Sequence, residues 1–157
     1  KAALQEALKE INSFRSHEGA VLEKDFVARI ENLLDLLKQV EAIDPERMDN
    51  VRERLNKAVT DIKENVDENR FEQELVYYIE KYDITEEEVR LKNHLSYFTE
   101  TLDTEDSNGR KLVFIGQEMG REINTIGSKS NYAPMQQLVV QMKDELEKIK
   151  EQILNVL

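Results

Sequence analysis

The sequence predicts an all-α fold, an elongated antiparallel helical bundle of about six helices in which the first and last helices are long. The chain of 157 residues contains only 5 glycines and 2 prolines, and 35% of its residues are charged against 39% hydrophobic. Apolar residues recur every three or four positions along most of the chain, as on one face of a helix. This mixture favours amphipathic helices over strands or disorder, in a single helical domain over residues 1–157.

Residues 1–66 are expected to form a long helical hairpin. A first apolar stripe runs from Leu4 to Val40 and predicts one helix that ends near Ala42. Asp44-Pro45 is typical of a helix start, because aspartate can cap and proline suits the first helical position. A first helix of roughly 60 Å, at about 1.5 Å per residue, needs a partner along its length, from this chain or another.

Residues 67–157 are expected to form the remaining helices. Phe71 to Tyr82 predicts a third helix, and Thr85 with Glu88 matches a capping box that would begin the fourth near Glu86. The polar run 103–108 is expected to be a loop. A fifth helix follows to Ile126, and a sixth runs from Pro134 to the end.

The fourth predicted helix places polar side chains together on the side away from its apolar stripe. They are Asp83, Glu86, Glu87, Arg90 and His94. Ordinary exposed ion pairs would explain this stripe, since helices often carry them. A carboxylate, a guanidinium and an imidazole on one face also suit phosphate chemistry.

The fifth predicted helix has a similar stripe in a stretch that is locally basic within an acidic chain. Glu118 and Glu122 lie one turn apart and could share Mg²⁺ or Mn²⁺, which prefer oxygen ligands. Such a pair is common on helix surfaces and is weak as a metal motif by itself. Four basic residues lie around it, as a phosphate-facing surface requires: Arg110, Lys111, Arg121 and Lys129.

Composition excludes several other classes of function. There is no cysteine, so disulfides, thiolate metal sites and cysteine nucleophiles are absent from this segment, which fits a reducing cytoplasm. The net charge of −11 argues against a nonspecific DNA coat. Neither Glu-x-x-His, G-x-G-x-x-G nor a Walker loop occurs, and apolar runs are too short for a membrane span.

A larger resemblance covers essentially the whole chain and is most specific between Arg70 and Ser130. The run 109–130 resembles the C-terminal signature of the YicC/YloC family. Upstream, Arg70 with Gln73-Glu74 and the polar residues of the fourth helix resemble the block that precedes it. The sequence departs from the usual pattern at Val113, Gly116 and Gly120.

The resemblance implies a bacterial, cytoplasmic, divalent-metal-dependent endoribonuclease that forms a homo-oligomer, with a hexamer expected, around an RNA channel. It also implies that this chain is the C-terminal half of a larger protein whose α+β N-terminal domain is absent, so activity of the fragment alone is not implied. The ion would be Mn²⁺ or Mg²⁺.

Roles for the polar residues follow as a hypothesis. We expect Glu118 and Glu122 to hold the ion, with Asp83, Glu86 and Glu87 as secondary ligands. His94 would transfer protons, because imidazole exchanges them near neutral pH. The residues expected to contact RNA are Arg70, Arg90, Arg110, Lys111, Arg121, Asn124, Thr125 and Lys129.

The same residues also permit a non-catalytic interpretation. In that alternative the chain is an oligomerisation or RNA-binding adaptor module, its polar stripes are helix or subunit contacts, and its long first helix is a strut. Ion pairs would then be buried between helices, and metal would change neither the melting temperature nor the affinity for RNA.

Overall fold

The computed structural model describes residues 2–61, 67–104 and 109–156, with the side chains of 12–17, 59 and 156 left aside. In these ranges it contains five helices: α1 (Ala2–Asp61), α2 (Glu68–Tyr82), α3 (Thr85–Leu102), α4 (Gly109–Lys129) and α5 (Ala133–Val156). The prediction of an all-α fold is confirmed. The first and last helices are indeed long, with 60 and 24 residues.

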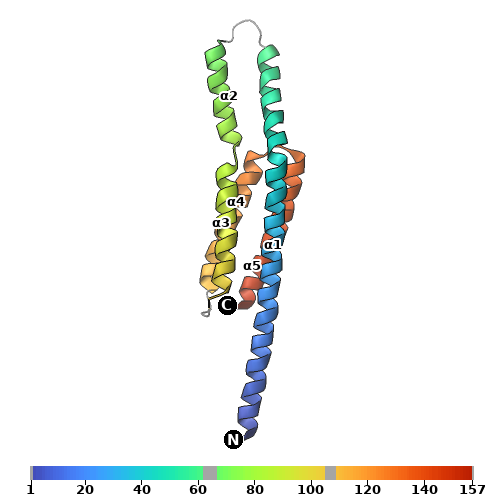
Figure 1. The fold of residues 1–157 in the computed structure, drawn as a ribbon, viewed down its shortest axis with the longest axis vertical. Coiled ribbons are helices and arrows are strands. Elements are labelled where there is room, and N and C mark those ends of the chain that lie inside the picture. Colours follow the sequence, from blue (N-terminus) through green and yellow to red (C-terminus); the bar gives the residue numbers. More distant parts are fainter. Residues whose placement is uncertain (1, 62–66, 105–108, 157) are drawn as a thin grey trace.

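Four of the helices form an up-and-down bundle (Figure 1). The chain rises along α1, descends through α2 and α3, rises again along α4 and descends along α5. Around the bundle α1 packs on α3, α3 on α4, α4 on α5, and α5 back on α1. Helix α2 contacts α1 above this bundle, as a continuation of α3.

The core is built from the apolar stripes that the sequence shows. Leu91, Leu95 and Phe98 of α3 are fully buried, and Phe98 meets Phe26 of α1 edge to face with ring centroids 5.6 Å apart. Burial of these side chains is the main stabilising term in such a bundle. The predicted core positions of the two last helices are buried as well, namely Leu112, Ile115, Met119, Ile123, Ile126, Met135, Leu138, Val139, Met142, Leu146, Ile149 and Ile153.

The predicted helix break at Asp44-Pro45 is wrong. Helix α1 continues through Pro45 to Asp61, so residues 2–61 contain no hairpin, and α1 pairs instead with α2. Proline inside a helix loses one hydrogen bond and crowds the carbonyl group of residue 41. Val40 and Arg47 are buried on either side of it, so packing holds the helix together across the proline.

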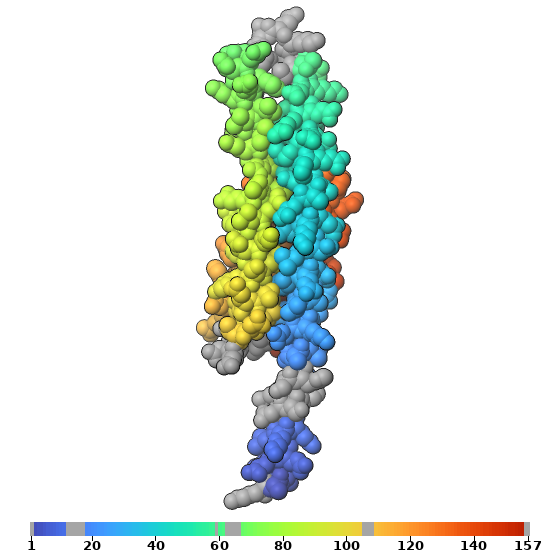
Figure 2. Space-filling model, in the orientation of Figure 1, coloured from blue at the N-terminus to red at the C-terminus, as the bar shows by residue number. Residues whose placement is uncertain are grey.

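The two ends of the molecule are less well packed. The N-terminal part of α1 extends beyond the bundle (Figures 1 and 2), and Leu4, Leu8 and Ile11 are about half exposed or more. None of the residues of α2 is buried. Positions 105–108 of the predicted loop lie outside the described residues, as do Ile62 and Val66, which we expect on the buried face of the helix predicted to begin at Asp44-Pro45.

Candidate functional site

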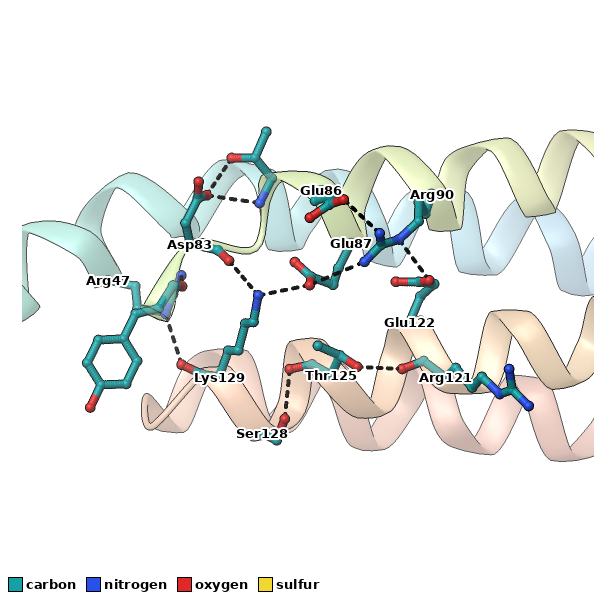
Figure 3. Close-up of polar contacts among 12 residues, drawn as sticks. Arg47, Asp83, Glu86, Glu87, Arg90, Arg121, Glu122, Thr125, Ser128 and Lys129 are labelled. Atoms are coloured by element: carbon teal, nitrogen blue, oxygen red, sulfur yellow. Dashed lines mark hydrogen bonds and ion pairs between the residues drawn. The ribbon is translucent and has the colours of Figure 1, made fainter. Parts of the chain in front are cut away.

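The polar stripes of α3 and α4 face one another and form a continuous series of ion pairs (Figure 3). We call Glu86, Glu87, Arg90, Glu122 and Lys129 the α3–α4 ladder. Lys129 Nζ donates to Glu87 Oε1 at 2.8 Å, and Arg90 Nε lies 3.0 Å from Glu122 Oε1. Arg90 also contacts Glu86 at 2.8 Å and Glu87 at 3.5 Å. The structure thus brings these five polar residues of α3 and α4 together, and their role as a functional site stays a prediction.

Two carboxylates of the ladder are deeply placed. The side chains of Glu87 and Glu122 are 4% and 10% exposed, whereas those of Arg90 and Lys129 are 44% and 29% exposed. Buried carboxylates require partners, because losing water costs several kcal/mol unless charge and hydrogen bonds compensate. The hydrogen bond with Glu122, together with the charges of Glu122, Glu86 and Glu87, raises the pKa of Arg90 above its usual value.

One oxygen in the ladder is left over. Glu87 Oε2 is buried and has no hydrogen-bond partner among the described residues, although Oε1 of the same carboxylate contacts both Lys129 and Arg90. A buried acceptor without a donor is unfavourable by about 1–3 kcal/mol. An incoming proton donor or cation that reached Glu87 Oε2 would remove this cost.

Asp83 has a structural task at the start of α3. Its Oδ1 accepts hydrogen bonds from the Thr85 hydroxyl at 2.6 Å and from the Thr85 backbone N–H at 3.0 Å. These bonds, in that order, lower the pKa of Asp83. The predicted Thr85–Glu88 capping box is therefore wrong: Asp83 precedes Thr85 closely enough to take its hydroxyl first, and the backbone N–H of Glu88 bonds Ile84 O instead.

Arg47 is a central residue that the sequence interpretation missed. Its side chain is 2% exposed and donates to Asp44 Oδ1 at 2.8 Å, Tyr82 O at 2.6 Å and Lys129 O at 3.3 Å. Tyr82 and Lys129 are the last residues of α2 and α4, so one cation caps two helix ends whose carbonyl groups lack partners. The signal available was Asp44-x-x-Arg47, which also fits an ordinary exposed helix pair.

Other predicted residues of α4 lie apart from the ladder. Glu118 pairs with Arg121 at 3.0 Å within α4, and Arg121 is 74% exposed and points away from Arg90 (Figure 3). The Thr125 hydroxyl donates to Arg121 O at 2.9 Å, and Asn124 is exposed. Helix α4 therefore turns part of its predicted RNA-binding set outward.

Three further residues predicted to contact RNA do not belong to the α3–α4 ladder. Lys111 lies over the ring of Tyr97, 5.3 Å from its centroid, and Arg110 is exposed in the first turn of α4. Arg70 is on α2, where it pairs with Glu74 at 3.8 Å. Arg70 thus does not join the ladder, because α2 lies above the bundle (Figure 1).

His94 lies on α3 one turn after Arg90 and is half-buried. Helices α3 and α4 run antiparallel, and Arg90 faces Glu122, so the next turn brings His94 level with Glu118. No group of three or more His, Asp or Glu side chains within the described ranges is arranged to hold a metal ion. The assignment of metal to Glu118 and Glu122 stays a prediction.

Comparison with known proteins agrees with the resemblance seen in the sequence. A family described as "Endoribonuclease YicC-like, C-terminal" matches residues 40–157. The chain belongs to the YicC-like family. It is 41% identical over 157 residues to the "Probable endoribonuclease YicC" of Clostridioides difficile (strain 630), covering 98% of this chain and 54% of that protein. The protein of the same name from Haemophilus influenzae (strain ATCC 51907 / DSM 11121 / KW20 / Rd) is 32% identical over 154 residues, with the same two coverages.

This YicC-like chain thus spans about half the length of the relatives it matches. No helix within the described ranges combines the length and apolarity that crossing a membrane requires.

The three positions at which this YicC-like sequence departs from the pattern expected for the family lie against the core or against α5. Val113 packs against the core, and Gly116 and Gly120 face α5. A Cβ atom at position 116 would lie 3.8 Å from Ile153, and one at position 120 would lie 3.3 Å from Leu146. All three departures concern helix packing, and none of them removes a side chain from the ladder.

Proposed function

We propose that the complete protein is a divalent-metal-dependent endoribonuclease and that the α3–α4 ladder is part of its RNA-cleaving site. The observation that carries the proposal is the unpartnered, buried Oε2 of Glu87, beside two cations that a phosphate can reach. The names of the two relatives supply the reaction class. We also propose that the protein is cytoplasmic, forms a homo-oligomer, with a hexamer expected, and acts together with an N-terminal domain.

Mn²⁺ and Mg²⁺ prefer oxygen donors such as these carboxylates, which would have to converge on the ion when it binds, since no three of them are so arranged within the described ranges. Glu87 offers a free buried oxygen, and Glu122 and Glu118 lie on the facing helix. Asp83 and Glu86 are further oxygen donors at the edge of the ladder, where Glu86 is 75% exposed. When bound, the ion would polarise a phosphate oxygen and lower the pKa of the attacking water.

Side chains of α3 and α4 would bind the phosphate and transfer the proton. Arg90 and Lys129 would exchange their carboxylate partners for phosphate oxygens, because the guanidinium group of Arg90 can bind phosphate through two N–H groups and the ammonium group of Lys129 can bind it as a point charge. Both cations are partly exposed, so this exchange requires no opening of the core. His94, one turn along α3, would hold or deliver the proton of the reacting hydroxyl.

Isosteric variants of the complete protein test this site. We expect Glu87→Gln and Glu122→Gln to lower the rate of RNA cleavage with Mn²⁺ by roughly 100-fold or more, the effect typical of a lost catalytic group. Glu100→Gln is the matched control, because Glu100 is an exposed carboxylate of α3 outside the ladder. Melting temperatures of all three variants show whether folding is retained. Unchanged cleavage by folded Glu87→Gln and Glu122→Gln proteins would remove the ladder from the reaction.

The adaptor alternative is supported by a specific observation. The buried carboxylate of Glu87 pairs with Lys129, and that of Glu122 pairs with Arg90, so both ion pairs connect α3 with α4 within one chain. A purely structural role requires such contacts. Calorimetry of the complete protein separates the two: a metal-binding site predicts a Mn²⁺-dependent rise in melting temperature, which Glu87→Gln abolishes. An adaptor predicts RNA retention without new RNA ends and no response to Mn²⁺.

A further inference from the structure

A cleft lies outside the ladder, where α1, α2 and the end of α4 meet. It has a volume of about 270 Å³ and is bordered by Arg47, Arg54, Tyr78, Tyr82, Lys129 and Asn131. Its floor is apolar, formed by Val51 and Leu55 one and two turns along α1 from Arg47. Ligand pockets of drug-sized molecules measure about 300–1,000 Å³, so this cleft suits one ring system rather than two.

Two tyrosines of α2 form the aromatic side of the cleft. Tyr78 and Tyr82 are one turn apart on α2, and their rings are nearly parallel, with centroids 6.4 Å apart and an interplanar angle of 15°. Both rings are only half-buried, because α2 contributes no buried residue to the molecule. Half-buried, nearly parallel tyrosine rings beside apolar side chains offer a surface on which nucleic-acid bases can stack.

The charged residues that line the cleft are basic, although the whole chain carries a net charge of −11. Arg54 is exposed at the mouth and has no ion-pair partner within the described ranges. Lys57 follows it on α1, and Lys81 Nζ lies 6.0 and 5.9 Å from the Tyr78 and Tyr82 centroids. By contrast, each of the three guanidinium nitrogens of Arg47 already donates a hydrogen bond, one to Asp44 and two to backbone carbonyl groups. Arg54 is therefore the cation that remains available to a phosphate.

The cleft is connected to the ladder through a single residue. Lys129 borders the cleft, while its ammonium group binds Glu87 at 2.8 Å and Asp83 O at 3.1 Å. A strand whose phosphate reaches Lys129 from the ladder would have its neighbouring nucleotide at the mouth of the cleft. Asn131 is placed there with an amide that can both donate to and accept from a base edge.

We propose that this cleft binds one unpaired nucleotide of RNA, with its base against Tyr78 and Tyr82 and its phosphate at Arg54. The inference rests on the proposed function for the identity of its ligand. The site favours a single-stranded position next to the ladder, because a paired base would first have to be unpaired and unstacked, at a cost of a few kcal/mol. The ladder itself contacts phosphates, so the cleft would be the part of the surface that selects unpaired RNA.

The test measures binding and cleavage separately on the complete protein. Fluorescence anisotropy of a labelled oligouridine in EDTA reports binding without cleavage. Arg54→Ala is expected to weaken binding about five- to tenfold and to reduce the slope of log K against log salt by about 0.7, the value for one phosphate of a single strand. Arg52→Ala is the matched control, since Arg52 lies on the same helix, pairs with Asp49 and does not border the cleft.

A second variant examines stacking. Tyr82→Leu is expected to weaken oligouridine binding about tenfold with an unchanged salt slope, and to abolish any preference over duplex RNA of equal length. Equal affinities of Arg54→Ala and Arg52→Ala, or a Tyr82→Leu protein that keeps its single-strand preference, would overturn the proposal. Cleavage by the unmodified protein with Mn²⁺ is scored independently: binding that depends on Arg54 without any cleavage would retain the cleft and reject the endoribonuclease.

Discussion

Arg47 donates a hydrogen bond of 2.6 Å to the carbonyl oxygen of Tyr82, and through its other terminal nitrogen it reaches Lys129 O at 3.3 Å. One buried side chain of α1 thereby joins the ends of α2 and α4. Both ends border the cleft, and the end of α4 also belongs to the ladder through Lys129. The bond geometry needs a planar guanidinium, because Asp44 occupies the third donor position.

Replacing Arg47 should therefore destabilise the protein more than any exposed arginine does. Arg47→Met keeps the volume but leaves Asp44 and two carbonyl groups without their donor. We expect a loss of about 2–4 kcal/mol in the free energy of unfolding, and a smaller loss for Arg47→Lys. Urea unfolding of the complete protein measures both. Arg52→Met, 55% exposed, is the control and should change stability by less than about 0.5 kcal/mol.

The sequence predicts the core of this fold well because periodic apolar residues have few other arrangements. Leu91, Leu95 and Ile123 are buried as their spacing indicates. The continuity of α1 could not be read in the same way, since Asp44-Pro45 is locally a good helix start, and only contacts from distant helices override it. Arg47 was missed for the same reason: its partners Tyr82 and Lys129 are 35 and 82 residues away.

For the site, sequence spacing places Glu87, Arg90, Glu122 and Lys129 on the polar sides of their helices, and the structure shows that these sides face one another. Sequence spacing does not predict which of the remaining polar residues turn outward, as Arg121 does, because their orientation depends on the rotation of α4 against α5. The cleft was not predicted at all. Its tyrosines look like an ordinary apolar stripe until α2 is seen to bury none of its residues.

Stability should depend on pH through Glu88, on the side of α3 that meets α1. Burial raises the pKa of Glu88 to about 7, and the carboxylates of Asp44, Glu41 and Asp83 act in the same direction, opposed by Arg47. Because the folded pKa is higher than the unfolded one, the folded protein binds the proton more tightly. The free energy of unfolding should therefore fall as pH rises from about 4.5 to about 7.

The variant Glu88→Gln isolates this contribution. Since the group is only half-buried, solvent screening reduces the expected effect to roughly 1 kcal/mol. Glu88→Gln should be more stable than the unmodified protein at pH 8 and nearly equal to it at pH 5, as measured by thermal unfolding. An equal difference at both pH values would contradict the assignment, and Glu100→Gln should show no difference at either.

Replacing two glycines of α4 by alanine should have different effects on the free energy of unfolding. At position 116 a Cβ atom meets Ile153 Cδ1 at 3.8 Å, an ordinary contact, so Gly116→Ala should stabilise by up to about 1 kcal/mol through helix propensity. At position 127 the Cβ atom would lie 3.1 Å from Val139 Cγ1, where α4 and α5 approach closely. The β-branched valine cannot easily move, so Gly127→Ala should gain less than Gly116→Ala or lose stability. Chemical unfolding of the two variants gives the order directly, and a reversed order would contradict the packing of α4 on α5.

The pair Lys129–Glu87 allows a last prediction that separates a structural ladder from a metal site. A double-mutant cycle with Lys129→Met and Glu87→Gln should give a coupling of about 1–3 kcal/mol in EDTA, because both side chains are mostly buried and 2.8 Å apart. If Glu87 also holds a divalent ion, Mn²⁺ competes with Lys129 for the same carboxylate, and the coupling should decrease as Mn²⁺ is added. A pair that serves packing alone keeps the same coupling at every Mn²⁺ concentration. The Arg29–Glu145 pair between α1 and α5, with 3.3 Å between its charged atoms, is the control, since it lies outside the ladder and its coupling should not respond to Mn²⁺.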